Sequence, residues 1–178
     1  MNECAYFHFP IEQMNQKNYI LDKIIAGKKL QRIAYEIAER NVEVKEIILA
    51  GVKENGLVIA HKIASLLEGI FDGNVKVISI TLDKKHPVNI VVEPATNVND
   101  KVVILVDDVA NSGKTLTYVL KPFLEQFPLK IQTLVLVERT HKTFPITADY
   151  VGLSVATTLQ EQIIVEVDKN EVTGAYLI

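Results

Sequence analysis

The chain has 178 residues, 48% of them hydrophobic and 23% charged, which is the composition of an ordinary globular protein and predicts one domain spanning 1–178. Its formal net charge of −3 gives no overall signal for nucleic-acid binding, and no apolar run reaches the roughly 18 residues that a membrane span needs. The N-terminus lacks the basic and apolar regions of a signal peptide, and the single cysteine, Cys4, excludes an internal disulfide, so we expect a cytoplasmic protein.

The first half of the chain predicts an arm followed by alternating strands and helices. Residues 1–18 show no clear periodicity, and their aromatic residues are compatible with packing on a partner subunit. Beyond them, buried strands alternate with segments whose apolar residues recur at helical spacing. The predicted strands are 19–22, 47–50 and 75–82, and the predicted helices are 28–40 and 57–67.

The second half continues the same alternation after an irregular stretch. A long excursion is predicted over 83–99, which contains Pro87 and Pro94. Pro122 falls inside a predicted helix over 115–127 and should kink it or end it early. Because strands alternate with helices, we expect an α/β fold with a twisted, mostly parallel sheet flanked by helices. The remaining predicted strands are 102–106, 133–137, 150–154 and 163–167.

The most informative stretch is a buried strand that ends in two adjacent acids. The uninterrupted apolar run Val102–Val106 predicts a parallel strand buried on both faces, and Asp107 and Asp108 follow it. Open α/β sheets bind ligands at the carboxyl ends of their strands. The small polar loop 111–115 then leads into a helix, whose first N–H groups favour an anion. Carboxylates beside a phosphate cradle suit a ribose 5-phosphate, which carries hydroxyls and a phosphate.

A nucleotide-binding P-loop is a competing interpretation, because Gly113, Lys114 and Thr115 match the last three residues of that motif. The motif also needs a glycine five positions before Gly113, and this chain has Asp108 there. An ordinary helix cap is a further alternative, since Asn and Ser are good caps. A cap alone does not explain the two acids that immediately precede the loop.

The acidic pair and its small-Ser-Gly-basic-Thr loop resemble the phosphoribosyl pyrophosphate (PRPP) signature of the type I phosphoribosyltransferases. Flanking segments resemble one branch of that family, the pyrimidine-operon attenuation regulators that are also uracil phosphoribosyltransferases. The resemblance runs from about Ile20 to the C-terminus and is weaker between 83 and 99. It implies the type I phosphoribosyltransferase fold, in which the N- and C-terminal segments form a small hood. The segments that resemble the branch are 33–41, 51–56, 134–142 and 145–152.

The resemblance implies that PRPP contacts three parts of the sequence. Asp107 and Asp108 would accept hydrogen bonds from the 2- and 3-hydroxyls of the ribose, a role that suits ionised carboxylates. From the residues alone, a solvated acid pair and a glycine turn before a helix remain alternatives. The diphosphate would lie on a loop that often carries a strained peptide in the family, formed by Gly51, Val52 and Lys53. The 5-phosphate would lie on the loop formed by Val109, Ala110, Asn111, Ser112, Gly113, Lys114 and Thr115.

The resemblance also implies where the nucleobase binds. The ring of Tyr150 would stack on the base and the backbone of Val151 would contact its polar atoms, although a tyrosine entering a strand is more often a core residue. Glu138 and Arg139 end a neighbouring strand at the base side. Purine-specific relatives carry lysine at the position of Glu138, where it donates to the 6-oxo group. Because an ionised acid cannot donate, Glu138 favours a pyrimidine.

The family implies a Mg²⁺ cofactor, which we expect to bind mainly to diphosphate and ribose oxygens. Asp107 and Asp168 are the candidate protein ligands. The long excursion would form a flexible lid over PRPP, with Lys84 or Lys85 as its catalytic cation, and a solvated charge run is the alternative. Asn55 stands where relatives usually carry arginine, and its neutral side chain would bind the diphosphate less strongly.

Taken with the resemblance, these residues predict a Mg²⁺-dependent pentosyltransferase that joins the ribose 5-phosphate of PRPP to a nucleobase. Uracil, giving UMP and pyrophosphate, is the best match. The alternatives are an RNA-binding pyrimidine-operon regulator, a nucleotide sensor with weak or no transferase activity, and a purine phosphoribosyltransferase. The family usually assembles as homodimers or larger homo-oligomers, and we expect no membrane partner. An RNA-binding face would use the basic residues Lys28, Lys29, Arg32, Arg40, Arg139 and Lys142.

Overall fold

The computed structural model describes residues 17–83, 86–158 and 161–178, which form two β-sheets and four helices. The elements are, in chain order, β1 (Asn18–Asp22), α1 (Lys23–Arg40), β2 (Glu46–Val52), α2 (Asn55–Leu67), β3 (Asn74–Leu82), β4 (Ile90–Glu93), β5 (Val102–Ala110), α3 (Lys114–Val119), α4 (Lys121–Leu124), β6 (Lys130–Arg139), β7 (Tyr150–Val155), β8 (Ile163–Asp168) and β9 (Glu171–Leu177).

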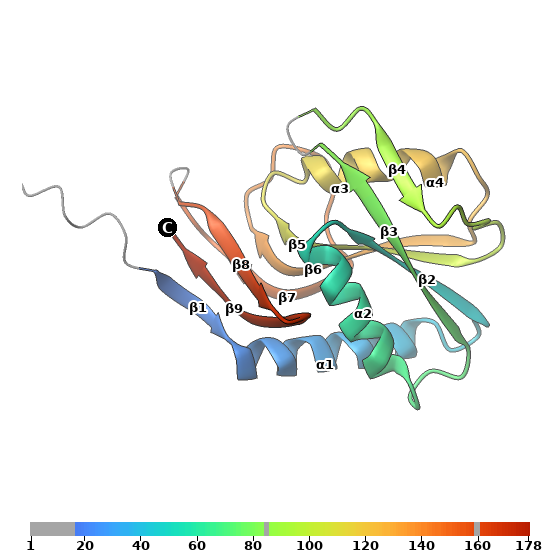
Figure 1. The fold of residues 1–178 in the computed structure, drawn as a ribbon, viewed down its shortest axis with the longest axis horizontal. Coiled ribbons are helices and arrows are strands. Elements are labelled where there is room, and N and C mark those ends of the chain that lie inside the picture. The colour runs from blue at the N-terminus through green and yellow to red at the C-terminus, as the bar shows by residue number, and fades with distance from the viewer. Residues whose placement is uncertain (1–16, 84–85, 159–160) are drawn as a thin grey trace, which may run out of the picture.

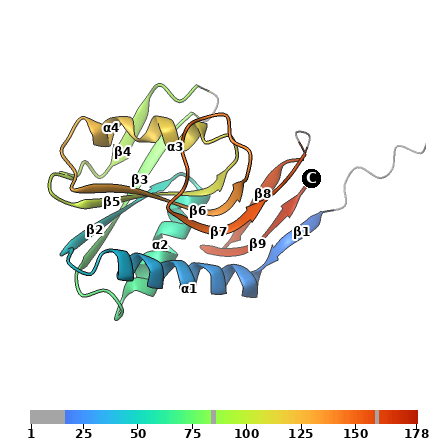
Figure 2. The same ribbon diagram turned by 180° about the vertical axis from the view of Figure 1, so that it is seen from behind.

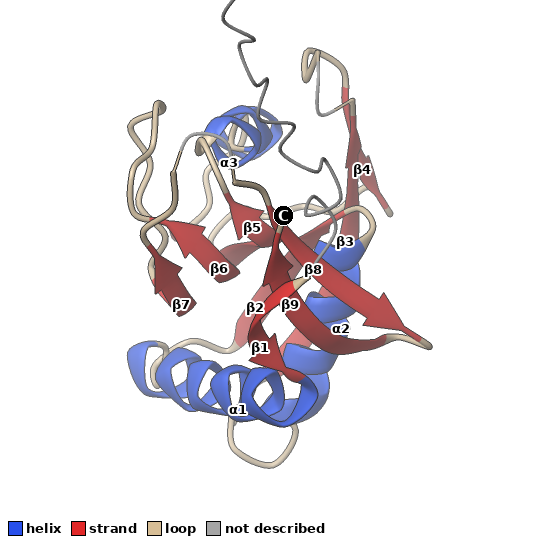
Figure 3. Ribbon diagram, turned by 90° about the vertical axis from the view of Figure 1, so that its left-hand side faces the viewer, coloured by secondary structure: helices blue, strands red, loops and turns tan. Residues whose placement is uncertain are grey.

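The main sheet has six strands in the order β4-β3-β2-β5-β6-β7. All neighbouring pairs are parallel except β3 and β4, which are antiparallel. Helices α1 and α2 cover one face, and α3 and α4 cover the other (Figures 2 and 3). The predicted α/β class and mostly parallel sheet are therefore confirmed, and β5 lies near the centre of the sheet.

Alternating residues of the central strands feed two separate hydrophobic cores. In β2, Ile47 and Leu49 pack with α1 and α2, whereas Ile48 and Ala50 pack with the residues of α3 and α4. All four side chains are fully buried. Because both faces are covered by helices, the strand is apolar throughout, as its unbroken hydrophobic run predicts.

A second, smaller sheet is built from both ends of the described chain. Strand β9 lies between β1 and β8 and pairs with each in antiparallel fashion. This sheet lies beside the main sheet and above the start of α1 (Figures 1 and 2). Lys17 and Tyr19 donate hydrogen bonds to Glu166 of β8, which tie the N-terminal strand to the C-terminal hairpin. It is the predicted hood, and we use that name for it below.

Local sequence explains where the helices begin and end. The side chain of Asp22 accepts a hydrogen bond from the N–H of Ile25 at 2.7 Å, so α1 starts at Lys23, five residues before the predicted start at 28. Pro122 lies in the first turn of α4, and the helix predicted over 115–127 is divided there into α3 and α4. The break expected at Pro122 is therefore confirmed.

The sequence-based expectation missed two strands, β4 and β9, and ended β5 four residues too early. The strand predicted over 102–106 continues to Ala110, because Asp107 pairs with Val135 and Val109 pairs with Val137 in the ladder with β6. The excursion over 83–99 contains β4, whose Ile90 pairs with Leu82 of β3. The pattern-based expectation also missed β9, which holds the hood together. No helix in the described part of the chain is long and apolar enough to span a membrane.

Candidate active site

The acidic pair lies in the second half of β5, next to the start of α2. Asp107 is 2% exposed and Asp108 is 9% exposed. The Oδ1 atom of Asp107 accepts from the N–H of Asp108 at 3.0 Å, and the Oδ1 atom of Asp108 accepts from the N–H of Val109 at 2.9 Å. Buried carboxylates need such donors, because burial disfavours the charged form. The backbone of the strand itself thus helps to hold both acids.

A small hollow adjoins the pair on the side of the loop that leads into α3. Its volume is about 50 Å³, and it is lined by Asp107 and the segment from Val109 to Leu116. Since a water molecule occupies roughly 30 Å³ in the liquid, the hollow has room for a small anion. Gly113 has a φ of 79°, in the left-handed region that favours glycine, and the N–H of Lys114 donates to Ser112 Oγ at 3.3 Å. The loop therefore curves around the hollow.

A larger pocket is lined by Asp108 and not by Asp107. Its volume is about 350 Å³, and its lining residues are Lys53, Glu54, Asn55, Leu82 and Asp108. The peptide bond between Lys53 and Glu54 is cis, and the N–H of Lys53 donates to the carbonyl of Ile80 at 2.9 Å. The pocket thus combines one ammonium group with two carboxylates, from Glu54 and Asp108.

The acidic pair connects the small hollow with the larger pocket. Asp107 lines the first and Asp108 lines the second. A ligand that carries a phosphate at one end, hydroxyls in the middle and a second anionic group at the other end matches this order. PRPP has this arrangement of groups.

Comparison with known proteins identifies the family. The model of the phosphoribosyl transferase domain matches residues 18–169. The chain belongs to the phosphoribosyltransferase family. A relative from Bacillus pumilus named Bifunctional protein PyrR is 36% identical over 179 residues, which cover 92% of this chain and 99% of the relative. The protein of the same name from Clostridium acetobutylicum is 39% identical over 164 residues, covering 86% and 92%.

Solved structures of other phosphoribosyltransferases share the fold. The hypoxanthine phosphoribosyltransferase of Trypanosoma cruzi superimposes with a TM-score of 0.76 at 16% identity, over 90% of this chain and 95% of that one. A hypoxanthine-guanine phosphoribosyltransferase from Bacillus anthracis gives a TM-score of 0.69 at 23% identity, over 85% and 88%. These structural likenesses confirm the type I phosphoribosyltransferase fold that the acidic motif predicted.

At the predicted base side, Glu138 forms a partly buried polar cluster. Its Oε2 atom is 2.6 Å from Nζ of Lys142, and its Oε1 atom accepts from Oγ of Ser154 at 2.7 Å. The side chains of Glu138 and Lys142 are only 13% and 12% exposed. Arg139 donates to the carbonyl of Glu161, and its Nε atom is buried without a partner among the described residues. The phosphoribosyltransferase thus has an acceptor and a donor side by side at the end of β6.

The structure places Tyr150 differently from the base-stacking prediction. Its side chain is fully buried, and its hydroxyl accepts from Gln132 Nε2 at 2.9 Å and from Asn41 Nδ2 at 3.3 Å. Burial raises the pKa of this tyrosine, and hydrogen bonds from Asn41 and Gln132 partly oppose the rise. The carbonyl of Val151 accepts from Arg32 at 2.6 Å. Tyr150 is a core residue that anchors β7 to α1, so its ring is not available to a base.

The predicted metal ligands do not form a carboxylate cluster. Asp168 ends β8 at the turn of the hood hairpin. The hydrogen bond and the charge of Glu171 raise the pKa of Lys23, and the charge of Asp168 adds a smaller contribution. Among the residues that the structure describes, no group of three or more His, Cys, Asp or Glu side chains could hold a metal. The acids at 107 and 108 offer the oxygen donors that Mg²⁺ prefers, but two carboxylates leave most of its octahedral positions to other ligands.

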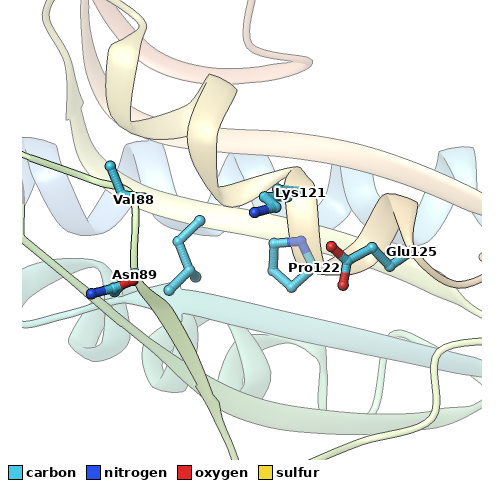
Figure 4. Close-up of a pocket in the computed structure, with 6 residues that line it drawn as sticks. Val88, Asn89, Lys121, Pro122 and Glu125 are labelled. Carbon is cyan, nitrogen blue, oxygen red and sulfur yellow. The ribbon is translucent and has the colours of Figure 1, made fainter.

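The predicted lid is described only in part. Lys84 and Lys85 lie outside the described residues. The next part of the lid borders a separate hollow of about 260 Å³ between the start of β4 and α4 (Figure 4). Val88 and Asn89 lie on one side of it, and the α4 residues lie on the other. None of the candidate site residues lines this hollow, so it is distinct from the candidate site around Asp107 and Asp108.

Most of the basic residues proposed for an RNA-binding face make contacts within the protein. Arg32 pairs with Glu36 and bonds the carbonyl of Val151, and Arg40 donates to the carbonyl of Asp149 at 3.0 Å. Arg139 and Lys142 make the contacts at the base side given above. Lys28 and Lys29 both lie on α1, where Lys28 is exposed and Lys29 is partly exposed. Arg32 nevertheless stays 48% exposed, whereas Lys142 is only 12% exposed.

Two functional features escaped the sequence analysis. Lys142 was assigned to an RNA face, and the structure places it on Glu138, four residues earlier. Asn55 was noted as the loss of a charge, and the structure shows its amide bound to Asp108. Charge spacing could have indicated the first contact, whereas the second joins residues that are 53 apart in the chain.

Proposed function

We propose that this phosphoribosyltransferase transfers the ribose 5-phosphate of PRPP to uracil and releases pyrophosphate. The observation that carries the proposal is the position of Asp107 and Asp108 between a small anion-sized hollow and a larger polar pocket. Family membership supports the reaction class, since it makes PRPP the expected sugar donor. The acids would accept hydrogen bonds from the ribose hydroxyls and so hold the 2,3-edge of the sugar, while the loop that leads into α3 would hold the 5-phosphate.

In this mechanism the protein acts by positioning and by electrostatic stabilisation. The bond from C1 to the diphosphate breaks as C1 gains oxocarbenium character, and a ring nitrogen of the base attacks from the opposite face. The proton that this nitrogen loses passes to the released pyrophosphate or to water. The carboxylates of Asp107 and Asp108 keep the ribose in line for that displacement. When Mg²⁺ is bound to the diphosphate, it neutralises charge on the leaving group.

The choice of uracil rests on the polar cluster at the end of β6. Glu138 supplies a hydrogen-bond acceptor and Lys142 supplies a donor 2.6 Å away. Uracil presents an N–H donor next to an oxo acceptor, so the two groups complement each other. The same pair occurs on an oxo-purine, and this favours hypoxanthine or guanine as the second candidate. Against the RNA-binding regulator stands Lys142, one of the six basic residues of that hypothesis, which is 12% exposed and paired with Glu138.

Pyrophosphate release tests the proposal. Wild-type protein is incubated with PRPP, Mg²⁺ and one base at a time: uracil, hypoxanthine, guanine, adenine or orotate. We expect pyrophosphate release with uracil, and EDTA should abolish this release. Release with an oxo-purine alone would replace uracil by the second candidate. If none of the five bases gives release, the proposed transferase is refuted.

A double variant tests the role of the acids. Asp107→Asn with Asp108→Asn removes two anionic acceptors and should lower turnover at least about 100-fold, because a misplaced sugar loses its alignment for displacement. Cooperative thermal unfolding should persist. Asp72→Asn, at an exposed acid between α2 and β3, is the matched control and should keep wild-type turnover. Full activity in the double variant would contradict the assignment of the acids.

A further inference from the structure

The side chain of Asn55 joins three segments of the protein at the larger pocket. Asn55 is the first residue of α2, and its Nδ2 atom donates to Oδ2 of Asp108 on β5 at 2.8 Å. The same nitrogen donates to the carbonyl of Val165 on β8 of the hood at 3.1 Å. A side-chain amide has two N–H groups, and each is directed to one acceptor. Diphosphate pocket, acidic strand and hood therefore meet at one residue.

An ordinary helix cap does not explain these contacts. Capping satisfies free backbone N–H groups at the start of a helix and needs a side-chain acceptor. The structure uses the NH₂ group of Asn55, which is a donor, and directs it away from its own helix to Asp108 and Val165. The cap position of α2 is Glu54, which makes no side-chain capping bond.

The carboxylate of Asp108 is held by donors from two different elements. Its Oδ1 atom accepts from Val109 N–H of its own strand at 2.9 Å, and its Oδ2 atom accepts from Asn55 of α2 at 2.8 Å. Two bonds to different oxygens restrict rotation of the carboxylate plane, whereas one bond would leave it free to turn. The amide achieves this without bringing a positive charge to the acid, so Asp108 stays a strong acceptor.

We infer that Asn55 is a positioning residue, which orients the Asp108 carboxylate toward a ribose hydroxyl and links that orientation to the hood. This inference rests on the proposed function, because it needs a ribose phosphate at the acidic pair. Asn55 acts through Asp108 and not on the reacting atoms. A ligand that orders Asp108 would then also order β8, because the two N–H groups of the Asn55 amide bond one to each.

Sugar discrimination tests the inference separately from turnover. Calorimetry measures the affinity of the full chain for ribose 5-phosphate and for 2,3-dideoxyribose 5-phosphate, which lacks both hydroxyls. Wild-type protein should prefer the ribose compound at least about tenfold, as expected for hydrogen bonds to a charged group. Asn55→Ala should lose about tenfold of that preference with little change in affinity for the dideoxy compound. The control Asn74→Ala, at an exposed position at the start of β3, should keep it.

A second variant adds a readout that loss of structure would not produce. Asn55→Asp keeps the shape of the side chain but places a carboxylate against Asp108, and two adjacent carboxylates compete for one proton. Binding of ribose 5-phosphate should therefore weaken strongly at neutral pH and recover in part as the pH is lowered, whereas wild-type binding should not improve at low pH. Circular dichroism confirms that each variant is folded.

The outcomes separate the two claims. If wild-type protein discriminates between the sugars and Asn55→Ala keeps the full preference, the positioning role is overturned and the proposed function stands. If wild-type protein binds both sugars equally or neither, the proposed function fails and the inference fails with it. The positioning role is supported if Asn55→Ala loses the preference for ribose 5-phosphate and if binding by Asn55→Asp recovers as the pH is lowered.

Discussion

Gly56, at the start of α2, packs closely against strand β5 in the candidate site. A Cβ atom added at Gly56 would lie 2.5 Å from the carbonyl oxygen of Val106 and 3.1 Å from the Cα of Asp107. Both neighbours are backbone atoms of a central strand, so neither can rotate away as a flexible side chain could. Gly56→Ala should therefore separate α2 from β5 at the acidic pair.

The expected loss of stability follows from that distance. Favourable contacts between carbon and a carbonyl oxygen lie at about 3.3 Å or more, so helix and strand must move apart by about 0.8 Å to relieve a 2.5 Å contact. Overpacking of this kind costs about 1–3 kcal/mol, and alanine returns about 0.5–1 kcal/mol of that through helix propensity. We expect a net loss on the order of 1–2 kcal/mol, which lowers Tm by about 2–8 °C in a chain of this size.

Gly27→Ala is the matched control, because Gly27 lies in the middle of α1 and an added Cβ would meet nothing within 4 Å. That change should raise stability by about 0.5–1 kcal/mol. Thermal and urea unfolding of both variants measure the difference, and pyrophosphate release should fall further in Gly56→Ala than its lost stability explains, because Asn55 moves with the helix. Equal or higher stability of Gly56→Ala would refute the close-packing argument.

Two further predictions concern the core and the hood. Tyr150→Phe removes the acceptor of two buried donors and should cost about 1–3 kcal/mol in urea unfolding; unchanged stability would contradict the role of the hydroxyl as a buried acceptor. Hydrogen bonds from Lys17 and Tyr19 lower the pKa of Glu166, so this carboxylate stabilises the hood fully above its ordinary value of 4.5, and the contribution is lost as the pH falls through the lowered value. Amide exchange in β1, corrected for its intrinsic pH dependence, should accelerate in that range, and Glu166→Gln should remove the effect.

The parts of the fold that the sequence predicted are those governed by local periodicity. The run Val102–Val106 indicated a strand buried on both faces, and the structure covers β5 with helices on each side. Pro122 indicated a helix break for a reason that holds in any context, since it has no N–H to donate. The loop 111–115 was similarly evident, because glycine and small polar residues between a strand and a helix have few other uses.

The parts that the sequence could not predict depend on contacts between distant residues. Strand β9 contains Gly174 and polar residues and has no strong local signal, and it is held in place by β1 at the opposite end of the chain. The period of two in β7 predicts that Tyr150 and Val151 face opposite sides of the sheet. Only the packing of α1 decides that Tyr150 turns toward the core, where Gln132 and Asn41 bind its hydroxyl.

The role of Asn55 shows how a change that weakens one function can support another. Judged by charge, an asparagine at this position only removes a cation from the diphosphate pocket, whose described residues then carry one ammonium and two carboxylates. Judged by geometry, the same amide holds Asp108 and reaches Val165 of the hood. If Mg²⁺ arrives with the diphosphate, as we propose, the cation supplies the missing charge where the pocket needs it. The neutral side chain is then free to orient the acid, which a charged one would partly neutralise.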